Sequence, residues 1–212
     1  MHRAHVQKAT LAARLARATC LVMPIARIPH KPEAADIEVR LAIIRAQLAA
    51  VPQVHVVEEC PELHSENYMF ELASKPGDEV FSLQGCDSFN NIAELTCAAN
   101  ILNRTTVIVA ARDGYALGDV NAVTRGHAHY KSAKSLDPRL DPSDPAVRIL
   151  DVWHNLADSR YGVIYAALGD LTLSSQTLRS TEIGQAPDLT AFFTDPAIEL
   201  IREHYVGRKV LP

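Results

Sequence analysis

In the first half of the chain, short runs of apolar residues alternate with longer segments in which apolar residues recur every three or four positions. A short continuous apolar run that is rich in β-branched side chains is typical of a strand buried on both faces. Recurrence every three or four positions, clearest at residues 37–48, predicts an amphipathic helix. The pattern predicts strands at 20–23, 54–57, 79–83 and 105–110, separated by helices at 37–48, 61–74 and 92–102.

This alternation of strands and helices determines the predicted fold class. Strands joined by helices pair in parallel, through right-handed crossovers. We therefore expect an α/β fold built on a doubly wound parallel sheet of at least four strands. In such sheets ligands bind beyond the carboxyl ends of the strands, so function is expected in the loops that follow the strands.

The second half of the chain has a different pattern. Residues 149–168 carry apolar positions at helical spacing, which predicts a helix, with a strand at 161–165 as the alternative. A last helix is expected from 194–195, with Pro196 in its first turn and Gly207 at its end. The predicted organisation is a basic N-terminal extension at 1–18, an α/β core at 19–115 and a mostly helical extension at 116–212 that packs on the core.

Composition and charge narrow the class of protein. The chain has 212 residues, 48% of them hydrophobic and 22% charged, which is enough to bury a substantial core. A net charge of −4 and a pI near 6.1 argue against nucleic acid as a partner, because phosphate backbones are bound by basic surfaces. No stretch is apolar over the length of a membrane span, so no membrane partner is expected. The four cysteines have neither C-x-x-C nor zinc-like spacing, which favours free thiols in a cytoplasmic protein.

Polar residues follow the predicted strands at the edge where the carboxyl ends converge. The loop at 84–91, after the third strand, contains Asp87 and leads to Glu94 in the first turn of the next predicted helix. Arg112 and Asp113 come directly after the fourth strand. A glutamate in a first helical turn either complements the helix dipole or presents an ionised group to the sheet edge, and the residues alone leave both interpretations open.

The segment around Glu94 resembles a known family. Residues 90–98, Asn-Asn-Ile-Ala-Glu-Leu-Thr-Cys-Ala, followed by Asn-Arg-Thr-Thr-Val-Ile-Val at 103–109, are similar to the nucleoside 2-deoxyribosyltransferase-like family, whose relatives include TIR-like nucleotide-binding proteins. In that family a polar loop after the third strand leads to a helix that carries a glutamate, with a small residue four positions later, here Ala98. The resemblance covers about residues 19–115.

The resemblance implies cleavage or transfer of an N-glycosidic bond in a nucleoside or nucleotide. Such a reaction passes through an oxocarbenium-like transition state and needs a carboxylate nucleophile and an acid that protonates the departing base. Glu94 occupies the family's nucleophile position, and Asp87 or Asp113 would act as the acid. A 5′-phosphate would be held by Arg27, Lys31 or Arg112. The remaining predicted substrate-binding residues are Ser88, Asn90, Asn91 and Asn121, and neither a metal nor a cofactor is expected.

Other functions fit parts of the sequence. A non-catalytic nucleotide-binding or sensing module, in which the second half transmits binding or holds a homo-oligomer, is the main alternative. Glu58, Glu59 and Glu62 are typical of magnesium-dependent nucleotide pyrophosphohydrolases, although Pro61 interrupts the helix that those enzymes need. An interaction protein is a further alternative, based on the basic N-terminus and on the long apolar stripe at 149–168.

Two further groups of residues have a chemical and a plain structural interpretation. Cys86 is either a nucleophile or a small buried thiol. His127 and His129 are either two metal ligands or surface residues, and the sequence favours the structural interpretation for both groups.

Overall fold

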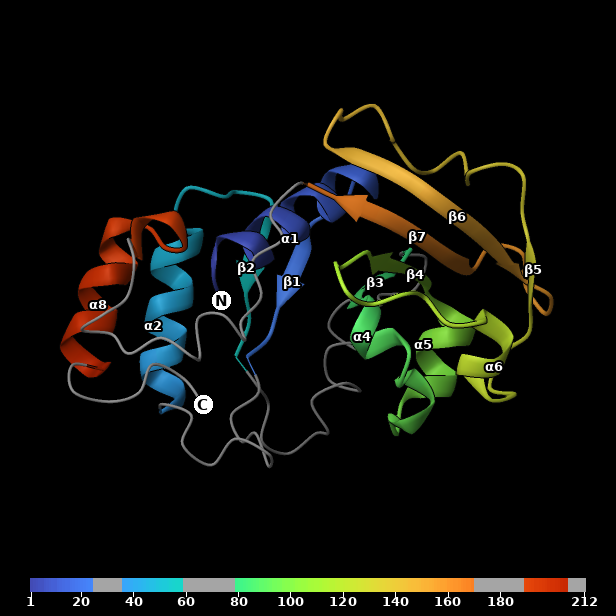
Figure 1. Ribbon diagram of the computed structural model, residues 1–212, viewed down its shortest axis with the longest axis horizontal. Helices are drawn as coiled ribbons and strands as arrows, with labels where there is room; N and C mark the ends of the chain where they lie inside the picture. Colours follow the sequence, from blue (N-terminus) through green and yellow to red (C-terminus); the bar gives the residue numbers. More distant parts are fainter. Residues whose placement is uncertain (25–35, 59–78, 170–188, 206–212) are drawn as a thin grey trace. The chain divides into compact units, whose positions relative to one another are not determined.

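The computed structural model describes residues 1–24, 36–58, 79–169 and 189–205 (Figure 1). The chain folds into two compact units. One unit comprises residues 1–10, 19–65 and 171–212, and the other comprises residues 11–18 and 66–170. Helix α1 (Arg3–Leu15) contributes its first part to one unit and its last part to the other.

The second unit is built on a five-stranded sheet with the strand order β3-β4-β7-β6-β5. Its strands are β3 (Phe81–Gly85), β4 (Thr106–Ala110), β7 (Gly162–Leu168), β6 (Val147–Asn155) and β5 (Tyr130–Ser132). The first three strands in this order run parallel, and β6 and β5 are antiparallel to their neighbours (Figure 1). In the parallel part, Gly85 pairs with Ala110, so the carboxyl ends of β3 and β4 are level. Ala110 in turn pairs with Ala166, and β7 continues for two residues beyond this pair.

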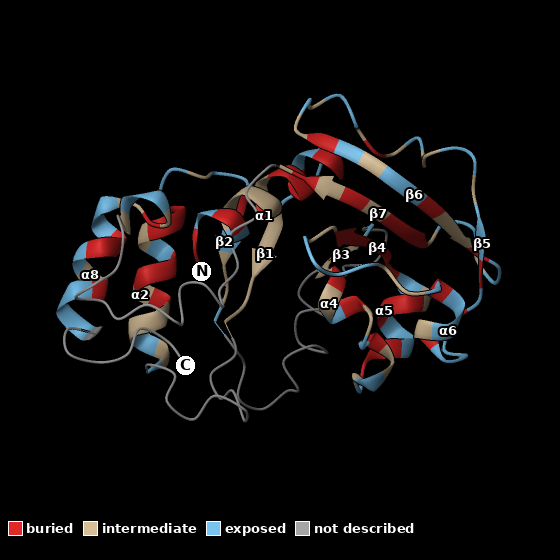
Figure 2. Ribbon diagram, in the orientation of Figure 1, coloured by how far each residue is buried: buried red, intermediate tan, exposed pale blue. Residues whose placement is uncertain are grey.

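Both faces of this sheet are covered, as the alternation in β4 shows. Val107 and Val109 belong to one buried cluster, and Ile108 and Ala110 belong to another. Because successive side chains of a strand point to opposite faces, the two clusters lie on opposite sides of the sheet. The first cluster is completed by short helices: α4 (Cys86–Phe89), the 3-10 helix η1 (Ile92–Glu94), α5 (Ala98–Arg104) and α6 (Val120–Thr124). The second cluster includes residues of α1 after position 10 (Figure 2).

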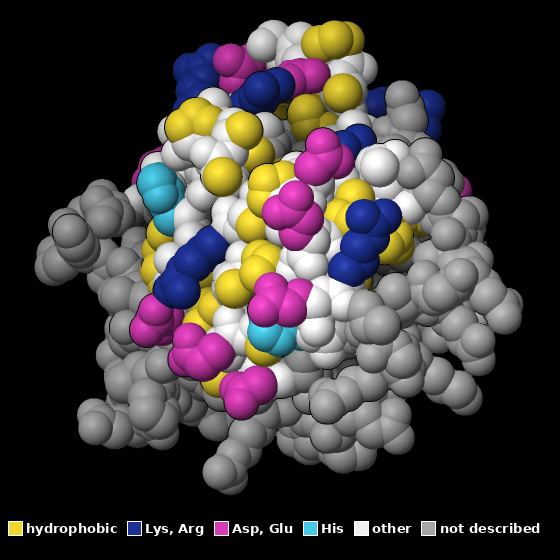
Figure 3. Space-filling view, turned by 90° about the vertical axis from the view of Figure 1, so that its left-hand side faces the viewer, with side chains coloured by type: hydrophobic (Ala, Val, Ile, Leu, Met, Phe, Trp, Pro, Cys, Tyr) yellow, Lys and Arg dark blue, Asp and Glu magenta, His cyan; other side chains and the backbone are white. Residues whose placement is uncertain are grey.

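The first unit pairs two helices and a two-stranded sheet. Strands β1 (Cys20–Val22) and β2 (Val54–Val56) are parallel. Helices α2 (Ile37–Leu48) and α8 (Asp195–Tyr205) pack against each other. The short 3-10 helix η2 (Leu189–Ala191) precedes α8 in the chain. Gln47 on α2 is buried, and its amide donates to the Phe192 carbonyl at 3.3 Å and accepts from the Thr194 N–H at 2.8 Å. On the face shown in Figure 3, acidic, basic and hydrophobic side chains are interspersed.

The protein is α/β, as the sequence predicts, but the predicted arrangement of strands is wrong in two respects. The four predicted strands do not form one sheet, because β1 and β2 pair with each other while β3 and β4 join β7. The five-stranded sheet is mixed rather than purely parallel, because β6 and β5 run antiparallel to their neighbours.

The predicted helix at residues 149–168 is also wrong. This stretch belongs to β6 and β7, which form an antiparallel hairpin, so the alternative of a strand at 161–165 is confirmed. The spacing of apolar residues suited a helix, but the polar stretch Asp158-Ser159-Arg160 interrupts it with a turn. The extension after residue 115 is therefore largely a continuation of the sheet, and α8 is its longest helix among the described residues.

Several local predictions are confirmed. Helix α2 has the predicted bounds, and α8 begins at Asp195 with Pro196 next. The basic N-terminal extension at 1–18 contains α1, with Leu11 and Leu15 buried. The predicted helix at 92–102 is instead divided between η1 and α5, and the predicted loop at 84–91 contains α4. The predicted helix at 61–74 and Gly207 lie outside the described residues. Within the described segments, no helix combines the length and the hydropathy needed to cross a lipid bilayer.

Candidate functional site

The level carboxyl ends of β3 and β4 bring two oppositely charged side chains together. Asp87 lies two residues beyond Gly85 of β3, and Arg112 lies two residues beyond Ala110 of β4. Nη1 of Arg112 donates to Oδ2 of Asp87 at 2.5 Å, and the two side chains are 25% and 34% exposed. The result is a partly buried ion pair at the edge of the sheet where ligand sites form in parallel α/β proteins.

Gly85 makes room for this ion pair. A Cβ atom at position 85 would lie 2.6 Å from Oδ1 of Asp87, closer than non-bonded atoms approach. The absence of a side chain at the last residue of β3 therefore lets the Asp87 carboxylate lie close to the end of the strand.

Tyr115 adds an aromatic ring to the ion pair. The guanidinium carbon of Arg112 lies 5.0 Å from the centre of the Tyr115 ring, a cation–π distance. The Tyr115 N–H donates to the Arg112 carbonyl at 3.1 Å, so a tight turn holds the two residues in this arrangement. Tyr115 is 44% exposed, which leaves much of its surface open to a ligand.

Cys86 and Tyr165 lie next to this turn and to each other. Cys86 is fully buried, and its thiol donates to the Tyr115 carbonyl at 3.7 Å. Burial raises the pKa of Cys86, the Asp87 carboxylate raises it further, and a hydrogen bond with Tyr165 acts in the opposite direction. Burial and the contact with Cys86 also raise the pKa of Tyr165, which lies on β7 opposite Val109 of β4. All three parallel strands thus contribute residues to this region.

The buried, protonated thiol leads to a testable prediction. We expect Cys86 to react with iodoacetamide at pH 8 on the order of 100-fold more slowly in the native protein than in the unfolded chain. In the native protein only a small fraction of the thiol is ionised, and burial keeps the reagent from the sulfur atom. Peptide mass spectrometry after timed labelling measures the rate, and the half-buried Cys20 provides a comparison within the same chain. Labelling of native Cys86 at the rate of an unfolded cysteine would contradict the burial described here.

The loop after β4 is fastened to the α4 segment by Asn90. Its side-chain amide donates to the Ala116 carbonyl at 3.0 Å, and its oxygen accepts from the Gly118 N–H at 3.1 Å. The neighbouring Asn91 donates to the carbonyl of Asp87 at 3.0 Å. Both asparagines, predicted as substrate-binding residues, direct their side chains to backbone groups in this structure.

Glu94, the predicted nucleophile, lies on η1 and is directed to a different partner. Its carboxylate is 3.5 Å from Nη2 of Arg125, and the two side chains are 60% and 62% exposed. The structure therefore joins Asp87 to Arg112 and Glu94 to Arg125, in two separate ion pairs.

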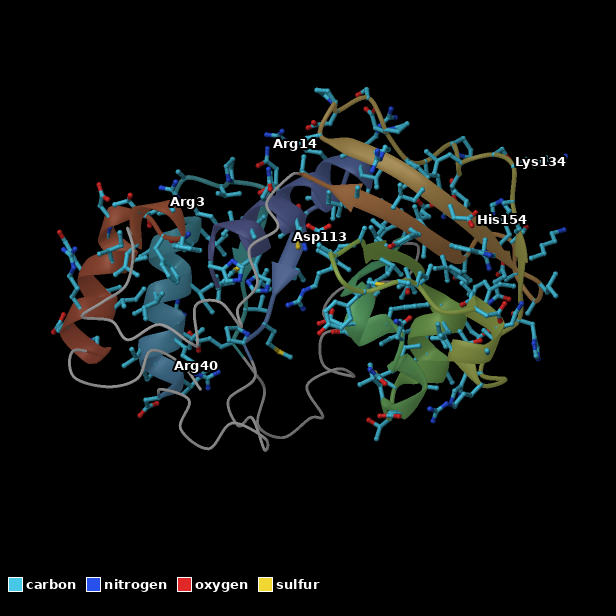
Figure 4. All side chains as sticks on the ribbon, in the orientation of Figure 1. Arg3, Arg14, Arg40, Asp113, Lys134 and His154 are labelled. Carbon is cyan, nitrogen blue, oxygen red and sulfur yellow. The ribbon has the colours of Figure 1, made fainter. Side chains whose placement is uncertain are left out.

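The other predicted site residues have varied surroundings. Asp113 is exposed on the loop after β4 (Figure 4), and Ser88 is exposed on α4. The Asn121 side chain donates to the Tyr130 carbonyl at 3.0 Å and accepts from its N–H at 2.8 Å, which joins α6 to β5. Arg27, together with Lys31, lies outside the described residues.

The sequence interpretation did not identify Tyr115 and Tyr165 as residues of this region. Tyr115 could have been found from its position, since an aromatic residue three places after Arg112 in an Asp-Gly turn lies near the same strand end. Tyr165 carried no such signal, because its segment was predicted as a helix rather than as a strand of the sheet.

The structure gives no support to the two metal-binding alternatives, the histidine pair and the glutamate cluster, among the residues that it describes. His127 and His129 are both exposed, and the described residues contain no group of three histidine, cysteine or acidic side chains that could hold a metal ion. Glu58 pairs with Arg45 at 2.5 Å, while Glu59 and Glu62 lie outside the described residues.

Comparison with known proteins does not assign the chain to a family. No family model matches the sequence, and a search of curated proteins finds none that is significantly similar. The function must therefore be inferred from the chemistry of the residues at the carboxyl ends of β3, β4 and β7.

Proposed function

We propose that the second unit binds a nucleoside or nucleotide at the carboxyl ends of β3, β4 and β7. The observation that carries the proposal is the Asp87–Arg112 ion pair beside the exposed ring of Tyr115. A guanidinium binds phosphate oxygens, a carboxylate accepts hydrogen bonds from ribose hydroxyls, and an aromatic ring stacks on a base. The three groups that recognise the three parts of a nucleotide thus lie within one turn and its ion-pair partner.

The ion pair is suited to exchange its partner for a ligand. Both side chains are a quarter to a third exposed, so neither charge is fully removed from water when the pair opens. A ligand phosphate could replace the Asp87 carboxylate at Arg112 and free that carboxylate for a hydroxyl group. Such an exchange keeps Arg112 paired throughout, and the released Asp87 carboxylate would accept a hydrogen bond from the hydroxyl group instead.

Cleavage or transfer of the N-glycosidic bond is a second candidate, supported by the exposure of Glu94. Its carboxylate is 60% exposed and its only described ion pair is loose, at 3.5 Å, so a ligand could reach it. In this reaction a Glu94 oxygen would form an ester bond to the sugar carbon as the bond to the base breaks, and an acid would protonate the base. Water or a second base would then displace the carboxylate.

A ligand panel tests the binding proposal. We expect a nucleoside, nucleotide or NAD to raise the melting temperature, because a ligand at about 100 times its Kd stabilises the native state by about 2.7 kcal/mol. Differential scanning fluorimetry against nucleosides, their mono-, di- and triphosphates, NAD and inorganic phosphate provides the measurement. A panel in which no compound raises the melting temperature would contradict the proposal.

Chromatography of the same mixtures distinguishes the two candidates. Binding without release of free base favours a non-catalytic module, and in that case Glu94→Gln should bind as the wild type does. Release of base that persists unchanged in Glu94→Gln would exclude Glu94 as the nucleophile. Release that stops in Glu94→Gln while binding is retained would establish N-glycosidic cleavage.

A further inference from the structure

The loop that carries Arg112 and Tyr115 is held by side chains that bond to its backbone. The Cys86 thiol donates to the Tyr115 carbonyl at 3.7 Å, and Asn90 bonds to the backbone on both sides of Leu117. Of these, Asn90 makes the shorter contacts, 3.0 Å to the Ala116 carbonyl and 3.1 Å from the Gly118 N–H.

In these contacts Asn90 uses one of its two N–H donors and one of the two lone pairs of its oxygen, so both ends of its amide group bond to the loop. Its amide group donates to one peptide and its oxygen accepts from another two residues later. The loop is also closely packed at this point, since a Cβ atom at Gly118 would lie 2.8 Å from Cγ2 of Val123 and 3.5 Å from Oδ1 of Asn90. The two asparagine contacts therefore fix where the backbone after Tyr115 runs.

We propose that Asn90 is a positioning residue of the nucleotide site: it holds the 112–118 loop so that Arg112 and Tyr115 are in place before the ligand binds. This inference rests on the proposed function of the site. A loop that is already ordered loses little conformational entropy on binding, whereas a loose loop must be ordered at the expense of affinity. Asn90 thus acts on affinity through the loop, in contrast to the direct substrate contact predicted from the sequence.

The test compares Asn90→Ala with Asn103→Ala as a matched control. Asn103 also donates from its side-chain amide to backbone carbonyls, at 3.0 Å to Ala99 and 2.7 Å to His127, but it holds a different loop. We expect Asn90→Ala to speed amide hydrogen exchange of residues 112–118 and to weaken the binding of adenosine 5′-monophosphate, each by about tenfold. Asn103→Ala should leave both quantities within about twofold of the wild type.

Each result of this comparison supports or overturns the proposal. Faster exchange in the loop together with weaker binding of adenosine 5′-monophosphate, in Asn90→Ala alone, supports it. Unchanged exchange, or faster exchange with unchanged affinity, overturns the positioning role although the wild type binds the nucleotide. If the wild type does not bind the nucleotide, the proposed function itself fails, and the positioning role fails with it.

Asn90→Asp provides a second variant in case Asn90→Ala does not fold. Aspartate has nearly the same shape and can still accept from the Gly118 N–H, but it cannot donate to the Ala116 carbonyl. We expect the amide hydrogen exchange of residues 112–118 to be faster in Asn90→Asp than in the wild type, because one of the two contacts is lost. It should stay slower than the exchange of an unstructured peptide of the same sequence, because the other contact remains. Adenosine, which carries no charge, is the probe for this variant, and its affinity should fall by less than about tenfold. Wild-type affinity in the presence of faster loop exchange would overturn the proposal.

Discussion

Replacing Gly162 by alanine should lower the free energy of unfolding by about 2–3 kcal/mol. A Cβ atom at this position would lie 2.3 Å from the carbonyl oxygen of Trp153 and 3.5 Å from its carbonyl carbon. These atoms belong to the backbone of β6, which pairs with β7 at His154 and Gly162, so no side-chain rotation can relieve the contact. The two strands must separate locally, at the pair that begins β7. Urea denaturation followed by the fluorescence of Trp153, the one tryptophan in the chain, measures the change.

Gly126→Ala is the matched control for this prediction. Gly126 has a φ of +81°, and a Cβ atom there would meet nothing within 4 Å. Alanine at this position is therefore destabilising only because of the left-handed backbone conformation. That conformation costs about 1–2 kcal/mol for a residue with a side chain. The prediction for Gly162 fails if its replacement is no more destabilising than that of Gly126.

Replacing Arg112 by alanine should weaken the binding of adenosine 5′-monophosphate by about 10- to 100-fold, the range for loss of a hydrogen bond to a charged group. The substitution removes the guanidinium proposed to hold the phosphate and also the cation that lies over the Tyr115 ring. Arg112→Lys keeps the positive charge but loses the planar fork, so its affinity should lie between those of alanine and arginine. Isothermal titration calorimetry measures the three affinities.

Arg125→Ala separates the role of Arg112 from the general loss of a positive charge. Arg125 also forms an ion pair, at 3.5 Å to Glu94, but its side chain is 62% exposed and it belongs to the end of α6. An exposed pair of this kind contributes at most about 1 kcal/mol to stability, and the affinity for the nucleotide should stay within about twofold of the wild type. Equal losses in the two variants would show that only net charge matters.

The parts of the fold that could be predicted are those encoded by neighbouring residues. Helix α2 matches its predicted bounds because its apolar residues recur at helical spacing and Asp36 caps its start by accepting from the Glu38 N–H. The bounds of β4 were clear for a similar reason, since it is a continuous apolar run buried at every position. Such signals depend on the local sequence alone.

The partners of the strands could not be predicted, because pairing is determined by contacts between distant segments. β4 lies between β3 and β7, and β7 lies in a segment whose spacing also suited a helix. Residues 162–168 form a strand because they pair with β6. Their apolar pattern fits a helix as well as a strand, so the pattern alone does not reveal that β6 is their partner.

The site shows the same division. Asp87 and Arg112 were placed at the sheet edge because each follows a predicted strand within four residues, and in the structure each lies two residues after the end of its strand. Glu94 was predicted in the first turn of a helix, but α5 begins only at Ala98, since residues 90–97 form turns and the 3-10 helix η1. That difference gives Glu94 an exposed position beside Arg125.

The division of the chain into two units has a consequence for the order of assembly during synthesis. Nearly all of the second unit comes from one continuous segment, residues 66–170, whereas α2 and α8 of the first unit are contributed from opposite sides of that segment. The contact between Gln47 and Thr194 spans 147 residues. A ribosome-bound chain can therefore complete the five-stranded sheet before the helix that covers Ile43 has been made, and during that interval the apolar face of α2 is exposed and prone to aggregation.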